Sequence, residues 1–126
     1  MKTLLAIVEQ GGYPDFSPVY ESLGYDVVIA PSMRKALALI KQHRPEVITA
    51  EFIYSPMYSA RISNLESLFA ALQSQQLMPQ LIVFVEPEIF HHLDKLEMRY
   101  YINQTITYPI TEHKLVNCLD ELHIAS

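Results

Sequence analysis

The stretch LIVFV, residues 81–85, consists only of apolar side chains and is rich in β-branched and aromatic ones. A short, continuous apolar run of this kind is typical of a strand that is buried on both faces of a parallel sheet. Similar runs precede it at LLAIV (residues 4–8), VVIA (residues 27–30) and VITA (residues 47–50), and a weaker one surrounds Ile106. The sequence therefore predicts five strands.

Segments with helical periodicity separate these runs. Ser17, Ser32, Ser63 and Thr111 stand where four helices are expected to be capped, and residues 88–100 are expected to form the remaining helix. Continuous apolar strands that alternate with helices predict an α/β fold, with a parallel sheet covered on both faces. Right-handed crossovers then favour a three-layer α/β/α sandwich with the flavodoxin-like strand order 2-1-3-4-5.

Composition limits the classes of protein that need to be considered. The chain has 126 residues, 50% of them hydrophobic and 18% charged, which predicts a single globular domain over residues 1–126. Its apolar runs are far shorter than the roughly 20 residues of a membrane span. The net charge is −5, and the basic residues Arg34, Lys35, Lys41 and Arg44 read as one solvated helix face, so no nucleic-acid partner is expected. Cys118 is the only cysteine, which favours a reducing, cytoplasmic compartment.

Polar residues gather where a sheet of this order would carry its functional crevice. That crevice lies at the carboxyl ends of the first and third strands, where the direction of winding reverses. Glu9 and Gln10 follow the first expected strand, and Glu51 follows the third. These three side chains are therefore the first candidates for a functional site.

The order and spacing of these residues resemble the receiver domains of bacterial response regulators, the CheY-like family, from Lys2 to about Leu122. Such domains carry two acidic residues after the first strand, a phosphoacceptor aspartate after the third, and Lys-Pro after the fifth. The corresponding stretches here are Val8-Glu9-Gln10, Pro45-Glu46-Val47-Ile48-Thr49-Ala50-Glu51 and Tyr108-Pro109. The resemblance implies that Glu51 occupies the acceptor position.

The phosphorylation chemistry of the family does not carry over with the resemblance. Glu51 is one methylene longer than aspartate, which displaces the carboxylate from an in-line geometry. Gln10 is neutral where a magnesium ligand is expected, and Tyr108 replaces the lysine that neutralises phosphoryl charge. Val85 or Glu86 falls where a hydroxyl would sense phosphate, and neither carries one. The resulting vestigial phosphoacceptor pocket is expected to comprise Glu9, Gln10, Glu51, Val85, Glu86 and Tyr108.

The sequence leaves several interpretations of this pocket open. Glu9, Glu51 and Glu86 could form a cation site or acid/base cluster, or could be hydrated or hydrogen-bonded to nearby backbone. Glu51 could also imitate the phosphorylated state, or act as a magnesium-dependent phosphoryl acceptor. A third class of function is a small-molecule or nucleotide sensor in the crevice near Gly11 and Tyr108.

The interpretation adopted is a stand-alone pseudo-receiver that is not an enzyme, uses no cofactor or metal, and binds another protein. The long connection over residues 52–63 is expected to be a recognition element, because exposed tyrosine and methionine suit partner contact. The resemblance adds a possible homodimer through residues 88–100, the strand around Ile106 and the last helix. The residues expected to contact the partner are Tyr54, Met57, Tyr58, Arg61, Tyr100 and Tyr101.

Overall fold

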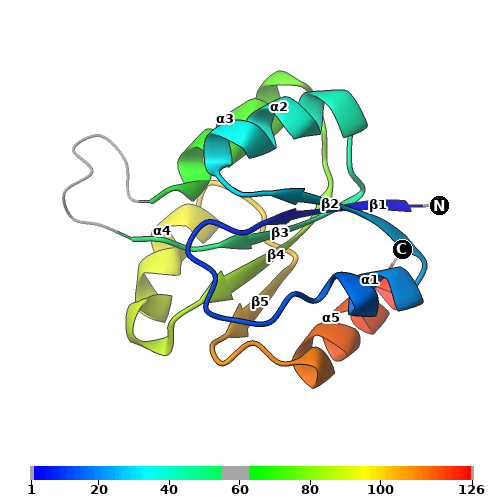
Figure 1. Ribbon diagram of the computed structural model, residues 1–126. Helices are drawn as coiled ribbons and strands as arrows, with labels where there is room; N and C mark the ends of the chain where they lie inside the picture. Colours follow the sequence, from blue (N-terminus) through cyan, green and yellow to red (C-terminus); the bar gives the residue numbers. More distant parts are fainter. Residues whose placement is uncertain (1, 55–62, 126) are drawn as a thin grey trace.

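A computed structural model describes residues 2–54 and 63–125 of the chain. In this part of the chain five strands form one parallel sheet in the order β2-β1-β3-β4-β5, as the sequence predicted (Figure 1). The strands are β1 (Lys2–Ile7), β2 (Tyr25–Ala30), β3 (Val47–Glu51), β4 (Gln80–Val85) and β5 (Gln104–Thr107). The carboxyl ends of β1 and β3 therefore lie side by side, at the expected position of the crevice.

Helices cover both faces of the sheet and complete the three layers (Figure 1). One face carries α1 and α5, and the other carries α2, α3 and α4. Their bounds are α1 (Ser17–Ser22), α2 (Met33–His43), α3 (Leu65–Ser74), the 3₁₀ helix η1 (Pro87–His92), α4 (Leu93–Glu97) and α5 (Glu112–Ala125). No helix in the described ranges combines the length and the apolar character that crossing a bilayer requires.

Strand β4 contributes side chains to the hydrophobic cores on both faces of the sheet. Leu81, Val83 and Val85 pack on the side of α2, α3 and α4, whereas Ile82 and Phe84 pack on the side of α1 and α5. All five side chains are at most 2% exposed. Successive residues of a strand point to opposite faces, so a strand that is apolar at every position requires cover on both sides.

Two of the four expected helix caps, Ser32 and Thr111, directly precede their helices. The Ser32 hydroxyl accepts a hydrogen bond from the Lys35 amide at 3.1 Å, and α2 begins at the next residue after Ser32. The Ser63 amide donates to the Glu66 carboxylate at 2.9 Å, which is one half of a capping box, but α3 begins at Leu65 and Asn64 directly precedes the helix. The expectation for Ser17 is wrong by one position: Ser17 is the first residue of α1 and Phe16 precedes the helix.

The helix expected over residues 88–100 is the main difference between prediction and structure. Residues Pro87–His92 form a 3₁₀ helix, and only Leu93–Glu97 are α-helical. The apolar pattern could not separate the two helix types, because Ile89 is the only apolar residue of the first turns that packs against the core. A single inward side chain carries no information about a period of 3.0 or 3.6 residues.

Candidate functional site

The Glu51 carboxylate is the centre of the site and is enclosed by donors. Its side chain is 2% exposed and lies at the carboxyl end of β3. One oxygen accepts from the Gln10 amide at 2.8 Å, and the other accepts from the Glu9 amide at 3.2 Å and the Tyr13 hydroxyl at 2.6 Å. The Gly11 amide approaches both oxygens, at 3.3 and 3.2 Å. Glu51 therefore ties β3 to the connection between β1 and α1.

The backbone of that connection is shaped to present its N–H groups to an anion. Gly11 and Gly12 both have positive φ angles, +74° and +87°, which residues other than glycine rarely adopt. Successive amides in such a turn point into one concavity and favour negative charge there. Three of the amides around this Gly-Gly pair bind the protein's own carboxylate.

Two tyrosines cover the buried carboxylate. The Tyr13 ring meets Phe84 edge-on at a centroid distance of 5.2 Å and lies 6.1 Å from the Tyr108 ring. The Tyr108 hydroxyl donates to the Gly11 carbonyl at 3.2 Å, so the residue at the lysine position closes over the glycine turn. Burial, and then the Glu51 charge, raise the pKa of both tyrosines well above the ordinary value of 10.0.

Asn64 holds the other side of the site. Its side-chain nitrogen donates to the Glu9 carboxylate at 2.6 Å and to the Glu51 backbone carbonyl at 2.7 Å. Its side-chain oxygen accepts from the Ile53 amide at 2.8 Å. One buried amide thereby fixes both acidic residues and the chain that leaves β3.

The remaining predicted pocket residues contribute little to this network. The Gln10 side chain is exposed, and Gln10 binds Glu51 through its backbone amide. Val85 is buried in the core, Glu86 is exposed, and the Tyr108 amide donates to the Val85 carbonyl at 3.1 Å. The structure therefore brings Glu9, Glu51 and Tyr108 together around the glycine turn.

The donor set does not fit the magnesium ion that the family resemblance would imply. Both Glu51 oxygens already accept from N–H or O–H groups, and Glu9 is bonded to Asn64. Magnesium prefers several anionic oxygens in octahedral geometry. In the described ranges there is no group of three or more acidic, histidine or cysteine side chains that could hold a metal ion. The hydrogen-bonded interpretation of Glu51 agrees with these contacts.

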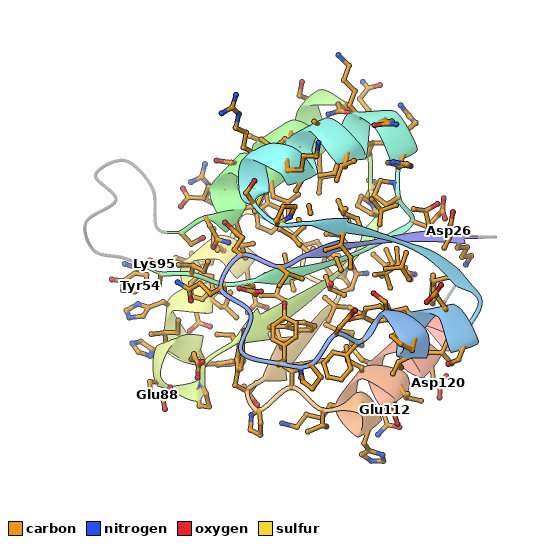
Figure 2. All side chains as sticks on the ribbon, viewed as in Figure 1. Asp26, Tyr54, Glu88, Lys95, Glu112 and Asp120 are labelled. Carbon is orange, nitrogen blue, oxygen red and sulfur yellow. The ribbon has the colours of Figure 1, made fainter. Side chains whose placement is uncertain are left out.

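The predicted partner-binding residues fall into three groups. Met57, Tyr58 and Arg61 lie outside the described residues, as does most of the connection over 52–63. Tyr54 is half-buried at the end of the molecule near η1, where its ring stacks on His92 at 3.8 Å (Figure 2). The remaining two residues, Tyr100 and Tyr101, are half-buried and 77% exposed respectively.

Comparison with known proteins shows which solved structures have a similar architecture. No protein-family model matches the sequence, and no curated protein matches it significantly. Among solved structures, Vibrio cholerae CheY4 aligns with 96% of this chain and 98% of its own, at 19% identity and a TM-score of 0.70. The receiver domain of Francisella response regulator 1452 aligns with 99% and 98%, at 18% identity and a TM-score of 0.73.

A CheY-like receiver domain from Methanospirillum hungatei covers 96% of this chain and 92% of its own, at 16% identity and a TM-score of 0.75. The chain has the receiver fold. The receiver fold explains why the sequence motifs converge, since the ends of β1, β3 and β5 form one edge in the observed strand order.

Two residues of the site were not found from the sequence. Tyr13 and Asn64 bind Glu51 and Glu9 across 38 and 55 positions of the chain. Asn64 lies next to the predicted cap Ser63, and this position is the one feature of the sequence that could have indicated its role. Tyr13 follows the Gly-Gly pair, but no local pattern shows that its hydroxyl returns to β3.

Proposed function

We propose that this receiver-fold protein is a signalling module that binds another protein and does not accept a phosphoryl group. The enclosure of the Glu51 carboxylate carries the proposal. A nucleophile must present a free lone pair in line with the phosphorus atom, and its charge must be balanced by metal or lysine. The Glu51 oxygens are instead occupied by the amides of Glu9, Gln10 and Gly11 and by the Tyr13 hydroxyl.

The neighbouring positions support the same conclusion. Gln10 carries no charge to attract magnesium, and Tyr108 donates its hydroxyl to the Gly11 carbonyl. A neutral phenol stabilises a developing phosphoryl charge less than an ammonium group does. Opening the pocket would also leave backbone amides without partners, which costs free energy for each one that stays buried.

The test is incubation of the purified protein with acetyl phosphate and magnesium, followed by intact-mass spectrometry. We expect no phosphoryl adduct, while a receiver domain with an aspartate acceptor is modified in the same reaction mixture. A magnesium-dependent adduct on Glu51 would refute the proposal.

The surface around η1 and α4 is the proposed site of partner binding. Five large apolar side chains are exposed among the described residues, and three of them, Phe90, Met98 and Tyr101, belong to η1, the end of α4 and the residues that follow. Exposed aromatic and methionine side chains in one region favour a protein interface. The region also belongs to the surface through which the family resemblance suggests a homodimer.

A second copy of the chain is the first partner to test. We expect sedimentation velocity to show concentration-dependent self-association, and Met98→Glu to weaken it at least tenfold by placing a charge in an apolar contact. Ile29→Glu is the matched control, because Ile29 is also exposed but lies on β2, at the opposite edge of the sheet. A single-chain mass at all concentrations would exclude the homodimer, and a loss of self-association in both variants would exclude this surface.

A further inference from the structure

A separate cavity of about 390 Å³ opens at the amino ends of β4 and β5. It lies between the end of α3 and the residues that follow α4, with Leu81 and Asn103 at its base. Glu51 is level with Phe84 in the sheet, three residues along β4 from Leu81, so the two sites are separated along the strand by roughly 10 Å at about 3.3 Å per residue. The volume is within the range of pockets that hold small molecules.

The first wall of the cavity is fixed by the end of α3. Gln76 has a φ of +57°, its amide donates to the Gln73 carbonyl at 3.1 Å, and the Leu77 amide donates to the Leu72 carbonyl at 2.9 Å. These two bonds form a Schellman motif, which brings the residue after the turn back over the helix. Leu72 and Leu77 both line the cavity as a result.

The second wall is a pair of aromatic rings. Phe69 and Tyr100 stack with a centroid distance of 4.2 Å and an interplanar angle of 3°. Both walls are thus held by contacts within the protein, so the cavity does not need a ligand to form.

The rim of the cavity leaves apolar surface in contact with solvent. Met78 is 94% exposed and Tyr101 is 77% exposed, and both line the opening. Large apolar side chains gain free energy when a ligand removes them from water. A thioether and a phenol ring suit the edge and face of a flat aromatic molecule.

The polar groups that line the cavity include one cation and three side-chain amides. Arg99 is the only charged residue among those that line it, and its guanidinium carbon lies 5.3 Å from the Tyr100 ring centroid. The Asn103 side-chain oxygen accepts from the Leu81 amide at 2.8 Å, which turns its NH₂ group away from that bond. In the described part of the chain this NH₂ group has no hydrogen-bond acceptor, and no aspartate or glutamate lines the cavity.

We propose that this cavity binds a small aromatic carboxylate. The ring would cover Met78 and Tyr101, and the carboxylate would accept hydrogen bonds from Arg99 and Asn103. A single guanidinium matches one carboxylate in a bidentate pair, whereas a phosphate dianion would require a second cation. The inference does not rest on the proposed function, although Tyr101, at the rim of the cavity, also belongs to the proposed partner surface.

The probe is naphthalene-2-carboxylate, titrated into the full chain carrying ¹³C-methyl methionine and followed by NMR. We expect a saturable shift of the Met78 methyl signal and no shift of the Met33 signal, because Met33 packs against the core from α2 and does not line the cavity. Arg99→Gln should weaken binding at least tenfold. Arg34→Gln, an exposed cation on α2, is the matched control and should leave the affinity unchanged.

Three results would overturn the proposal. The first is the absence of a saturable Met78 shift at millimolar probe. The second is equal affinity for naphthalene-2-carboxamide, which has the same ring without the charge. The third is unchanged affinity in Arg99→Gln, with an unchanged Met33 signal showing that the variant is folded. None of these three results would change the interpretation of the acetyl phosphate experiment, because that experiment reports on Glu51.

Discussion

Replacing Glu51 by glutamine tests whether the site is held by hydrogen bonds or by packing. The substitution keeps the size of the side chain and exchanges one acceptor oxygen for an NH₂ donor. If the nitrogen takes the position of the first oxygen, it faces the Gln10 amide across 2.8 Å. If it takes the other position, it faces the Glu9 and Gly11 amides at 3.2 Å each. In either orientation the new NH₂ donor faces a backbone N–H donor, so at least one hydrogen bond is lost.

The expected cost follows from these contacts. A hydrogen bond to a charged group contributes about 1.5–3 kcal/mol and a neutral one about 0.5–1.5 kcal/mol. Glu51→Gln loses at least one bond and the charge in the others. We therefore expect the free energy of unfolding to fall by about 2–4 kcal/mol. Tyr13→Phe removes one bond to the same carboxylate and should cost about 1–2 kcal/mol.

Urea denaturation followed by circular dichroism measures both variants and the double variant. We expect the two effects to be non-additive by about 1 kcal/mol or more, because the hydroxyl and the carboxylate are in direct contact. Glu86→Gln is the matched control, since it removes the same charge from an exposed residue at the same edge of the sheet. A Glu51→Gln variant within about 0.5 kcal/mol of the parent protein would refute the account of the site, because surface substitutions fall in that range.

Three further predictions concern the core, a turn and the alkaline limit of stability. Phe84→Ala should lower the free energy of unfolding by about 3–5 kcal/mol, because Phe84 is 1% exposed; a melting temperature within a degree or two of the parent would contradict its place in the core. Gln76→Gly should raise that free energy by about 0.5–1 kcal/mol, because φ is +57° there, and a destabilised variant would contradict the strain. Burial raises the pKa of Tyr13, Tyr20 and Tyr108 above 10.0, so the folded protein keeps protons that the unfolded chain releases. Stability should be complete below pH 10 and fall above it by up to about 1.4 kcal/mol per pH unit for each group, and Tyr13→Phe should reduce that slope in urea denaturation at a series of pH values.

The fold could be predicted because its signals are local. Residues 81–85 are apolar at every position, and only a strand covered on both faces buries all of them. The caps of α2 and α5 have the same local character: the Ser32 and Thr111 hydroxyls accept from amides three residues further on. The chain order of strands and helices then restricts the topology, because parallel strands are joined by right-handed crossovers.

Local pattern failed where several conformations satisfy the same residues. Over Pro87–His92 only Ile89 packs against the core, so an α-helix and a 3₁₀ helix were equally consistent with the sequence. The stacking of the His92 ring on Tyr54 joins this turn to the end of β3. Tyr54 precedes α3 in the chain and His92 follows it, so no local sequence pattern could have predicted this contact.

The sequence by itself determined that Glu51, Glu9 and Tyr108 meet at one edge of a parallel sheet, because strand order brings the ends of β1, β3 and β5 together. Only the tertiary structure decided what the carboxylate does there. Its orientation depends on the positive φ angles of Gly11 and Gly12, which turn amides toward it, and on the Tyr13 hydroxyl 2.6 Å away. A buried carboxylate must find donors, but which donors it finds depends on the packing of loops that are distant in the chain.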